Sequence, residues 1–185
     1  LSPPGVVQRA ERDRLAADAN GKLKVSEVKR SQRKRRPAPP FITSTLQQDA
    51  ARKLGFSAQR TMRTAQTLYE AGHITYMRTD SVHLSGDALS DLRSCIQSMF
   101  GAEYLPEKPN FFKTKSKNAQ EAHEAIRPTC AARKPADLKG SLSDDEARLY
   151  GLVWKRSMAC QMTPALVDLV AVEFECAGDA AFRAN

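Results

Sequence analysis

The chain has 185 residues, of which 41% are hydrophobic and 27% are charged, and its net charge is +8. This composition indicates a globular protein of one or two domains. No apolar run approaches the roughly 20 residues that a membrane-spanning helix needs, and the four cysteines lack the CxxC pairs of a zinc site. Because the first residue is Leu1 rather than methionine, we expect the chain to be a piece of a longer protein.

The positive charge is concentrated near the N-terminus. Residues 1–36 hold 11 Lys/Arg and 4 Asp/Glu, so they carry +7 of the net charge of +8. Within them, the sequence KRSQRKRR at 29–36 has six cations in eight residues. Such a run suits a polyanion, because each neutralised phosphate releases counterions. On charge alone, a solvated basic stretch without a partner is an equal alternative.

The first half of the chain predicts a strand followed by three helices. Residues 22–28 alternate as a strand does, and the proline-rich segment 37–40 ends that element and marks a domain boundary. Helical spacing follows, with possible caps at 43–45 and at Ser57, and with Met62, Ala65, Leu68 and Tyr69 on the inner face of the second helix. A third helix begins after Ser85 and runs to about residue 100.

The second half predicts a loop, a long helix and a strand. Residues 101–119 read as a loop with alternating lysines, and the capping box that begins at Ser143 opens a helix that runs to about Met162. The buried stripe of this helix is expected to contain Tyr150, Val153, Trp154 and Met158. Residues 167–175 are strand-like. Strands at both ends of a helical middle predict an α+β fold.

The segment ITYMRTDS at 74–81 is the first candidate for chemistry. In an extended segment, side chains at i and i+2 leave the same face, so Tyr76 and Arg78 are expected to point together. A free phenol has a pKa near 10, and a nearby cation favours its ionised form. A guanidinium also stabilises charge on phosphate oxygens in a transition state. Tyr76 is therefore a candidate nucleophile and Arg78 its phosphate contact, while a tyrosine that merely packs in a strand is the plain alternative.

The segment EAHEAIRP at 121–128 is the second candidate. Arg127 has the geometry to donate two hydrogen bonds to a phosphate, and His123 titrates near neutral pH. The segment is not an HExxH metal motif, because Arg127 stands where the second histidine would be, so no metal site is predicted here. A surface histidine and a salt-bridged arginine remain open as alternatives.

Four ordered segments resemble the type IA DNA topoisomerases, in the form of bacterial DNA topoisomerase I: PFITSTLQQ at 40–48, ITYMRTDS at 74–81, QEAHEAIRP at 120–128 and ACQMTPA at 159–165. The resemblance implies that Tyr76 attacks a DNA phosphodiester and forms a 5′-phosphotyrosyl link. It further implies that Arg78 positions and stabilises the scissile phosphate. His123 and Arg127 would help to bind the DNA.

The resemblance also implies a domain organisation within a multidomain toroidal enzyme. A mainly helical gate domain would span residues 37–162, and antiparallel strands of the arch domain would lie at 1–36 and 163–185. Mg²⁺ would be bound in the full-length enzyme by an acidic Toprim domain, which we expect to be absent because the chain has no Asp-x-Asp pair. No nucleotide is implied, because one phosphodiester is exchanged for another of similar energy.

The implied partners are single-stranded or underwound DNA and the remaining topoisomerase domains of the parent chain, with no membrane, in the bacterial cytoplasm at the nucleoid. This piece alone is expected to be inactive.

Two alternatives to this interpretation remain. The first is another enzyme that cleaves DNA through a tyrosine nucleophile. It fits the sequence less well, because tyrosine recombinases place the tyrosine after His-x-x-Arg, whereas Tyr76 precedes His123. A basic, helical nucleic-acid-binding module without catalysis, built on residues 29–36, is the non-enzymatic alternative.

Overall fold

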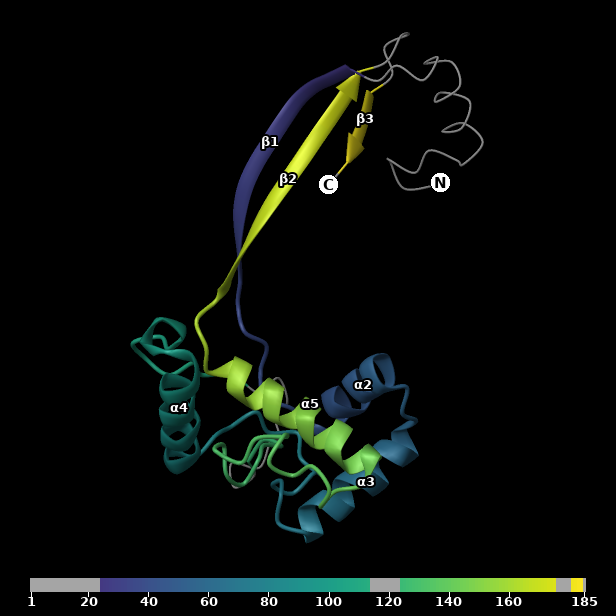
Figure 1. Ribbon diagram of the computed structural model, residues 1–185, viewed down its shortest axis with the longest axis vertical. Coiled ribbons are helices and arrows are strands. Elements are labelled where there is room, and N and C mark those ends of the chain that lie inside the picture. Colours follow the sequence, from purple (N-terminus) through teal and green to yellow (C-terminus); the bar gives the residue numbers. More distant parts are fainter. Residues whose placement is uncertain (1–23, 114–123, 176–180, 185) are drawn as a thin grey trace. The chain divides into compact units, whose positions relative to one another are not determined.

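The structure is a computed structural model that describes residues 24–113, 124–175 and 181–184. The chain divides into two compact units (Figure 1). The strand unit comprises residues 1–35 and 165–185, and the helical unit comprises residues 36–164. The observed helices and antiparallel strands confirm the predicted α+β class. The identification of these units with the arch and gate domains stays a prediction.

The strand unit is an antiparallel sheet in the order β1-β2-β3. Its strands are β1 (Lys24–Arg35), β2 (Ala165–Glu175) and β3 (Ala181–Ala184). The strand expected at 22–28 is observed from residue 24 onward, but it continues through most of the basic run. Cross-strand partners explain this extension, because β2 sets mainly apolar side chains opposite the basic ones and adds an acid at Asp168, which accepts a hydrogen bond from Gln32 at 2.9 Å.

The helical unit contains α2 (Thr43–Leu54), α3 (Ala58–Glu70), α4 (Gly86–Phe100), the short 3₁₀ helix η1 (Ala102–Tyr104) and α5 (Asp144–Cys160). Helix α5 packs against α2, α3 and α4 (Figure 1). Its predicted buried stripe is confirmed at Tyr150, Val153, Trp154 and Met158. The Trp154 indole N–H donates to the carbonyl of Ala131 at 2.8 Å, so this tryptophan is a core residue with a satisfied polar atom.

Serine caps start three of these helices as the sequence predicts. The side chains of Ser57, Ser85 and Ser143 accept hydrogen bonds from backbone N–H groups three residues later, at 3.2, 3.3 and 3.4 Å. The expectation of caps at 43–45 is corrected in part. Ile42 occupies the N-cap position and Thr43 already lies inside the helix, but the hydroxyl of Thr45 accepts from the backbone N–H of Ile42 at 3.0 Å. Helix α5 also ends at Cys160, two residues before the predicted end.

The loop predicted at 101–119 is irregular over its described part, residues 101–113, apart from η1. Lys113 lies at the end of that part, and the other alternating lysines, Lys115 and Lys117, lie outside the described residues. Within the described ranges, no helix has both the length and the apolar character that crossing a bilayer requires.

Candidate active site

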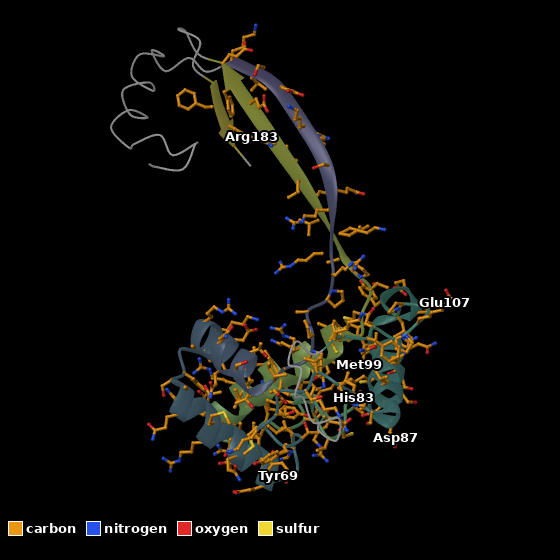
Figure 2. The ribbon with its side chains drawn as sticks, turned by 180° about the vertical axis from the view of Figure 1, so that it is seen from behind. Tyr69, His83, Asp87, Met99, Glu107 and Arg183 are labelled. Atoms are coloured by element: carbon orange, nitrogen blue, oxygen red, sulfur yellow. The ribbon has the colours of Figure 1, made fainter. Side chains whose placement is uncertain are left out.

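Tyr76 lies on the surface of the helical unit, with 43% of the residue exposed. Its ring meets the ring of Tyr69 edge to face, with centroids 5.3 Å apart and planes inclined at 65°. Tyr69 was expected on the buried face of its helix, but it is 40% exposed and lies at the outside of the unit (Figure 2). The reason is the phase of the helix: the buried residues of α3 are Thr61, Thr64, Ala65 and Leu68, and Tyr69 lies beside that face.

The segment that carries Tyr76 does not form a regular strand. Ile74 makes an isolated antiparallel bridge with Pro128, and residues 75–80 have no ladder partner. The alternation inferred from the sequence nevertheless appears in the exposure, because Tyr76 and Arg78 are exposed while Met77 between them is buried. Burial of Met77 in the core therefore replaces strand pairing as the force that turns the two polar residues outward.

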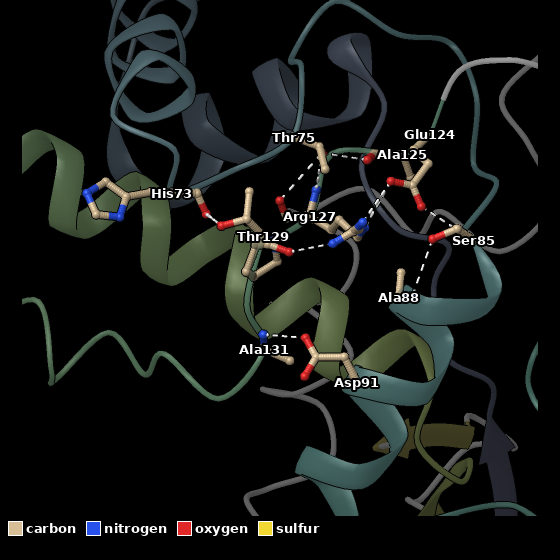
Figure 3. A network of polar contacts seen from close by, with 11 residues as sticks. His73, Thr75, Ser85, Ala88, Asp91, Glu124, Ala125, Arg127, Thr129 and Ala131 are labelled. Atoms are coloured by element: carbon tan, nitrogen blue, oxygen red, sulfur yellow. Dashed lines mark hydrogen bonds and ion pairs between the residues drawn. The ribbon is translucent and has the colours of Figure 1, made fainter.

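Thr75 anchors the segment on the side that precedes Tyr76 (Figure 3). Its hydroxyl donates to the carbonyl of Ala125 at 2.8 Å and accepts from the backbone N–H of Arg127 at 3.0 Å. Its own backbone N–H donates to the carbonyl of Arg127 at 2.9 Å. These hydrogen bonds to residues 125–127 therefore hold the residue next to Tyr76 in place.

Thr43 anchors the segment on the side of Arg78. Its hydroxyl donates to the carbonyl of Met77 at 2.7 Å and accepts from the backbone N–H of Thr79 at 2.9 Å. The backbone N–H of Thr43 donates to the carbonyl of Thr79 at 2.9 Å. The start of α2 thus fixes the backbone on both sides of Arg78.

The side chains of Tyr76 and Arg78 themselves carry no such restraints. Among the described residues, neither the Tyr76 hydroxyl nor the Arg78 guanidinium makes a hydrogen bond or an ion pair. The arrangement therefore presents a phenol and a free guanidinium from a fixed backbone, two residues apart. A phenol can attack an electrophile, and a free guanidinium can receive an anion.

Arg127 lies in a different environment, since only 14% of its side chain is exposed. Its Nη2 and Nε donate to one Glu124 carboxylate oxygen at 2.8 and 3.2 Å, and its Nη1 donates to the carbonyl of Pro128 at 2.9 Å (Figure 3). Each guanidinium nitrogen of Arg127 thus has an internal acceptor. The salt bridge is observed, and the predicted contact of Arg127 with DNA stays a prediction.

Glu124 connects Arg127 to helix α4. Its second carboxylate oxygen accepts the backbone N–H of Ser85, the N-cap of α4, at 2.7 Å (Figure 3). Partial burial by itself would raise the pKa of Glu124, but the hydrogen bonds from Arg127 and Ser85 outweigh it and lower this pKa below its ordinary value. Glu124 is therefore held as a carboxylate that ties residues 124–128 to the start of a helix.

His123, the other residue predicted to bind DNA, lies outside the described residues. Within the described part of the chain, no group of three or more His, Cys, Asp and Glu side chains could hold a metal ion. These residues therefore do not fit Mg²⁺, and no step of the chemistry is assigned to a metal here.

Sequence reasoning missed the residues that support the Tyr76 segment. Thr43 and Thr75 lie within the motifs at 40–48 and 74–81, but the sequence predicts only a possible cap at 43–45 and no contact for Thr75. Glu124 lies within the motif at 120–128. Their partners lie 34 to 52 residues away for the threonines and 39 residues away for the bond from Ser85 to Glu124, so local spacing gives no signal of these contacts.

The family model described as DNA topoisomerase matches residues 5–185 of this chain. DNA topoisomerase 1 of Xylella fastidiosa is 53% identical over 185 residues, which cover 95% of this chain and 23% of the relative. DNA topoisomerase 1 of a Synechocystis strain is 56% identical over 150 residues, which cover 81% of this chain and 16% of the relative. The chain thus spans less than a quarter of the length of these curated relatives.

The fold resembles that of full-length topoisomerase I from Thermotoga maritima, with a TM-score of 0.75 and 36% sequence identity. This likeness covers 97% of the present chain and 29% of the Thermotoga chain. The chain therefore belongs to the bacterial DNA topoisomerase I family.

Proposed function

We propose that this chain provides the nucleophile with which a type IA topoisomerase breaks and rejoins single-stranded DNA and so relaxes negative supercoils. Tyr76 is the nucleophile, and Arg78 binds the phosphate under attack. His123 and Arg127 contact the DNA nearby. The substrate is single-stranded or underwound DNA in the bacterial cytoplasm, and the reaction uses no nucleotide.

One observation carries this proposal. Tyr76 and Arg78 project from a backbone that is anchored on both sides, and neither side chain has a hydrogen-bond or ion-pair partner among the described residues. The guanidinium of Arg127, by contrast, already has internal acceptors. A free guanidinium beside an exposed phenol, in a chain that matches the DNA topoisomerase family, favours recognition of a DNA phosphate by this pair.

The chemistry is a transesterification. The Tyr76 oxygen forms a bond to phosphorus, and the bond from phosphorus to the 3′ oxygen of the DNA breaks. The tyrosine proton is lost and the departing 3′ oxygen gains one, so the products are a 5′-phosphotyrosyl link and a free 3′-hydroxyl. Arg78 offers its N–H donors to the non-bridging oxygens, whose negative charge must be stabilised as the bond forms. Religation is the same step in reverse.

Mg²⁺ belongs to the proposal only through other regions of the enzyme. The described residues do not form a metal-binding cluster, so we propose that an acidic Toprim domain supplies the ion in a full-length topoisomerase that carries this sequence. The 185-residue chain alone should then bind DNA weakly and leave supercoils unrelaxed. Robust magnesium-dependent relaxation by the isolated chain would contradict this part of the proposal.

The test of the nucleophile is Tyr76→Phe in a full-length topoisomerase that carries this sequence. Denaturing the reaction should trap a covalent protein–DNA adduct with the unsubstituted enzyme and none with the variant, while DNA binding is retained. Tyr104→Phe is the matched control, because Tyr104 is a similarly exposed tyrosine of the same unit and should keep the adduct. An adduct that survives Tyr76→Phe would remove Tyr76 as the nucleophile.

The same experiment separates the enzyme from a nucleic-acid-binding module without catalysis. The basic run lies on the exposed strand β1, so a module that acts through it would show DNA binding that weakens steeply with salt. Such a module would form no adduct with or without Tyr76.

A further inference from the structure

The hydroxyl of Thr43 bridges the two peptide groups that flank Arg78. The carbonyl of Met77 belongs to the peptide before Arg78, and the N–H of Thr79 belongs to the peptide after it. The hydroxyl of Thr43 donates to the first at 2.7 Å and accepts from the second at 2.9 Å. One oxygen atom therefore restrains both backbone bonds of the residue whose side chain is free.

The start of helix α2 does not need this hydroxyl. The N-cap residue Ile42 has its backbone N–H satisfied by the hydroxyl of Thr45 at 3.0 Å. A threonine in the first turn of a helix ordinarily offers its hydroxyl to nearby backbone groups. Here the acceptor and the donor lie 34 and 36 residues along the chain, so the contact serves residues 77–79 rather than the helix.

Two further restraints lie beside Arg78. The backbone N–H of Thr43 donates to the carbonyl of Thr79 at 2.9 Å, and Met77 is only 1% exposed. Its burial fixes the direction in which the chain enters Arg78, but it leaves rotation about the bonds of Arg78 to the two flanking peptides. Because the side chain has no hydrogen-bond or ion-pair partner among the described residues, the backbone is what sets the point and direction from which it projects. Loss of the Thr43 hydroxyl would remove the bonds to the Met77 carbonyl and the Thr79 N–H, and would leave only the backbone bond from Thr43 to Thr79 beside Arg78.

We propose that Thr43 is a positioning residue for Arg78, which keeps the guanidinium in place to receive the scissile phosphate. Thr43 itself touches neither DNA nor the reacting atoms. This inference rests on the proposed function, because it assigns to Arg78 the role of phosphate contact. A displacement of about 1 Å in a reacting group can cost about 100-fold in rate, so a hydroxyl that sets the position of Arg78 matters for the chemical step.

The test uses a full-length topoisomerase that carries this sequence and measures the single-turnover rate of DNA cleavage. Thr43→Val removes the hydroxyl and keeps the shape, so it should slow cleavage by about 10- to 100-fold with little change in the KM for DNA. Thr43→Ser keeps the hydroxyl and should restore most of the rate. If the valine variant does not fold, Thr43→Ala offers the same loss with less crowding.

Thr61→Val is the matched control. Thr61 is buried in α3, and its hydroxyl donates to the carbonyl of Ser57 at 2.9 Å, so the change also deletes a bonded threonine hydroxyl of the same unit. It should leave the cleavage rate unchanged. Equal slowing by Thr61→Val and Thr43→Val would show a general loss of stability and overturn the proposal.

A double-mutant cycle decides whether Thr43 acts through Arg78. If it does, Thr43→Val should slow Arg78→Ala enzyme by less than twofold, because no guanidinium remains to be positioned. Effects that multiply would overturn the proposal. The adduct test with Tyr76→Phe addresses the proposed function separately. Tyr76 can be confirmed as the nucleophile there while the double-mutant cycle supports or contradicts the role of Thr43.

Discussion

Arg78 and Arg127 were both expected to hold phosphate, but the structure uses them in opposite ways. The backbone around Arg78 is tied down and its guanidinium is free among the described residues. The backbone of Arg127 is tied to Thr75, and its guanidinium is also engaged by Glu124 and Pro128. Two arginines with the same sequence-based role thus differ in whether their charge is already used.

This difference teaches how an anion site can be recognised in a fold. A buried or half-buried guanidinium with several acceptors stabilises the protein, and releasing it exposes an unpaired carboxylate. A free guanidinium contributes little to stability, and on a restrained backbone only the side chain has to be ordered when it binds. Replacing Arg78 should therefore lower the cleavage rate more than the stability, whereas replacing Arg127 should mainly lower the stability.

The largest expected effect comes from Arg78→Ala. Removing one donor of transition-state charge costs about 100- to 1,000-fold in rate in comparable sites, so DNA cleavage by a full-length enzyme should fall by about that factor. The melting temperature should stay the same, because no internal partner is lost among the described residues. Arg63→Ala on α3 is the control, since Arg63 is also exposed and likewise has no side-chain partner there.

A drop in melting temperature with Arg78→Ala, at an unchanged rate, would break the comparison. If Arg63→Ala slowed DNA cleavage as much as Arg78→Ala, the loss of rate would follow from removing any exposed cation of the unit.

Arg127→Met should have the next largest effect, and it should appear in stability. The change removes the charge-assisted hydrogen bonds to Glu124 and the bond to Pro128, which should cost about 2 kcal/mol in the free energy of unfolding. Denaturant titration of the 185-residue chain measures this loss. A stable Arg127→Met variant that still loses DNA binding would show that Arg127 leaves Glu124 to contact phosphate.

Glu124→Gln should have the smallest effect and one that depends on pH. Partial burial raises the pKa of Glu124, but hydrogen bonds from Arg127 and Ser85 lower it overall, below its ordinary value of 4.5. A lowered folded-state pKa stabilises the protein fully above the ordinary pKa, and this stabilisation is lost as the pH falls through the folded-state pKa. Glu124→Gln should therefore be less stable near pH 7 and should lose less on acidification.

Denaturant midpoints at pH 7 and at successive pH values below 4.5 would check whether the stability of Glu124→Gln depends less on pH. Asp49 keeps some acid sensitivity in both proteins, since burial raises its pKa but bonds from Lys53 and Arg156 lower it overall. A Glu124→Gln profile parallel to that of the unsubstituted chain would show that Glu124 does not supply the acid sensitivity.

The helices could be predicted because their signals are local. Ser57, Ser85 and Ser143 each cap a helix from within a few residues, and the apolar stripe of α5 lies at helical spacing. The α+β class followed from the order of these elements. Strand β1 was harder, because its basic sequence favours a strand only when β2 is present to pair with it.

The support of the candidate site could not be predicted for the opposite reason. Whether Arg127 is free or paired depends on Glu124, and whether Glu124 is free depends in turn on the start of α4 at Ser85. Thr43 could be read only as a cap until its distant partner Met77 was known. Such contacts depend on tertiary packing, which spacing along the chain does not encode.

The two threonine anchors have a mechanical consequence. If Tyr76 is covalently linked to a DNA end during strand passage, any pulling force on that strand acts on the protein through the Tyr76 side chain. The anchors at Thr43 and Thr75 connect that point to helix α2 and to residues 125–127. To detach the Tyr76 segment, the force would have to break several hydrogen bonds at once. The helical unit would therefore move with the DNA end as one rigid body.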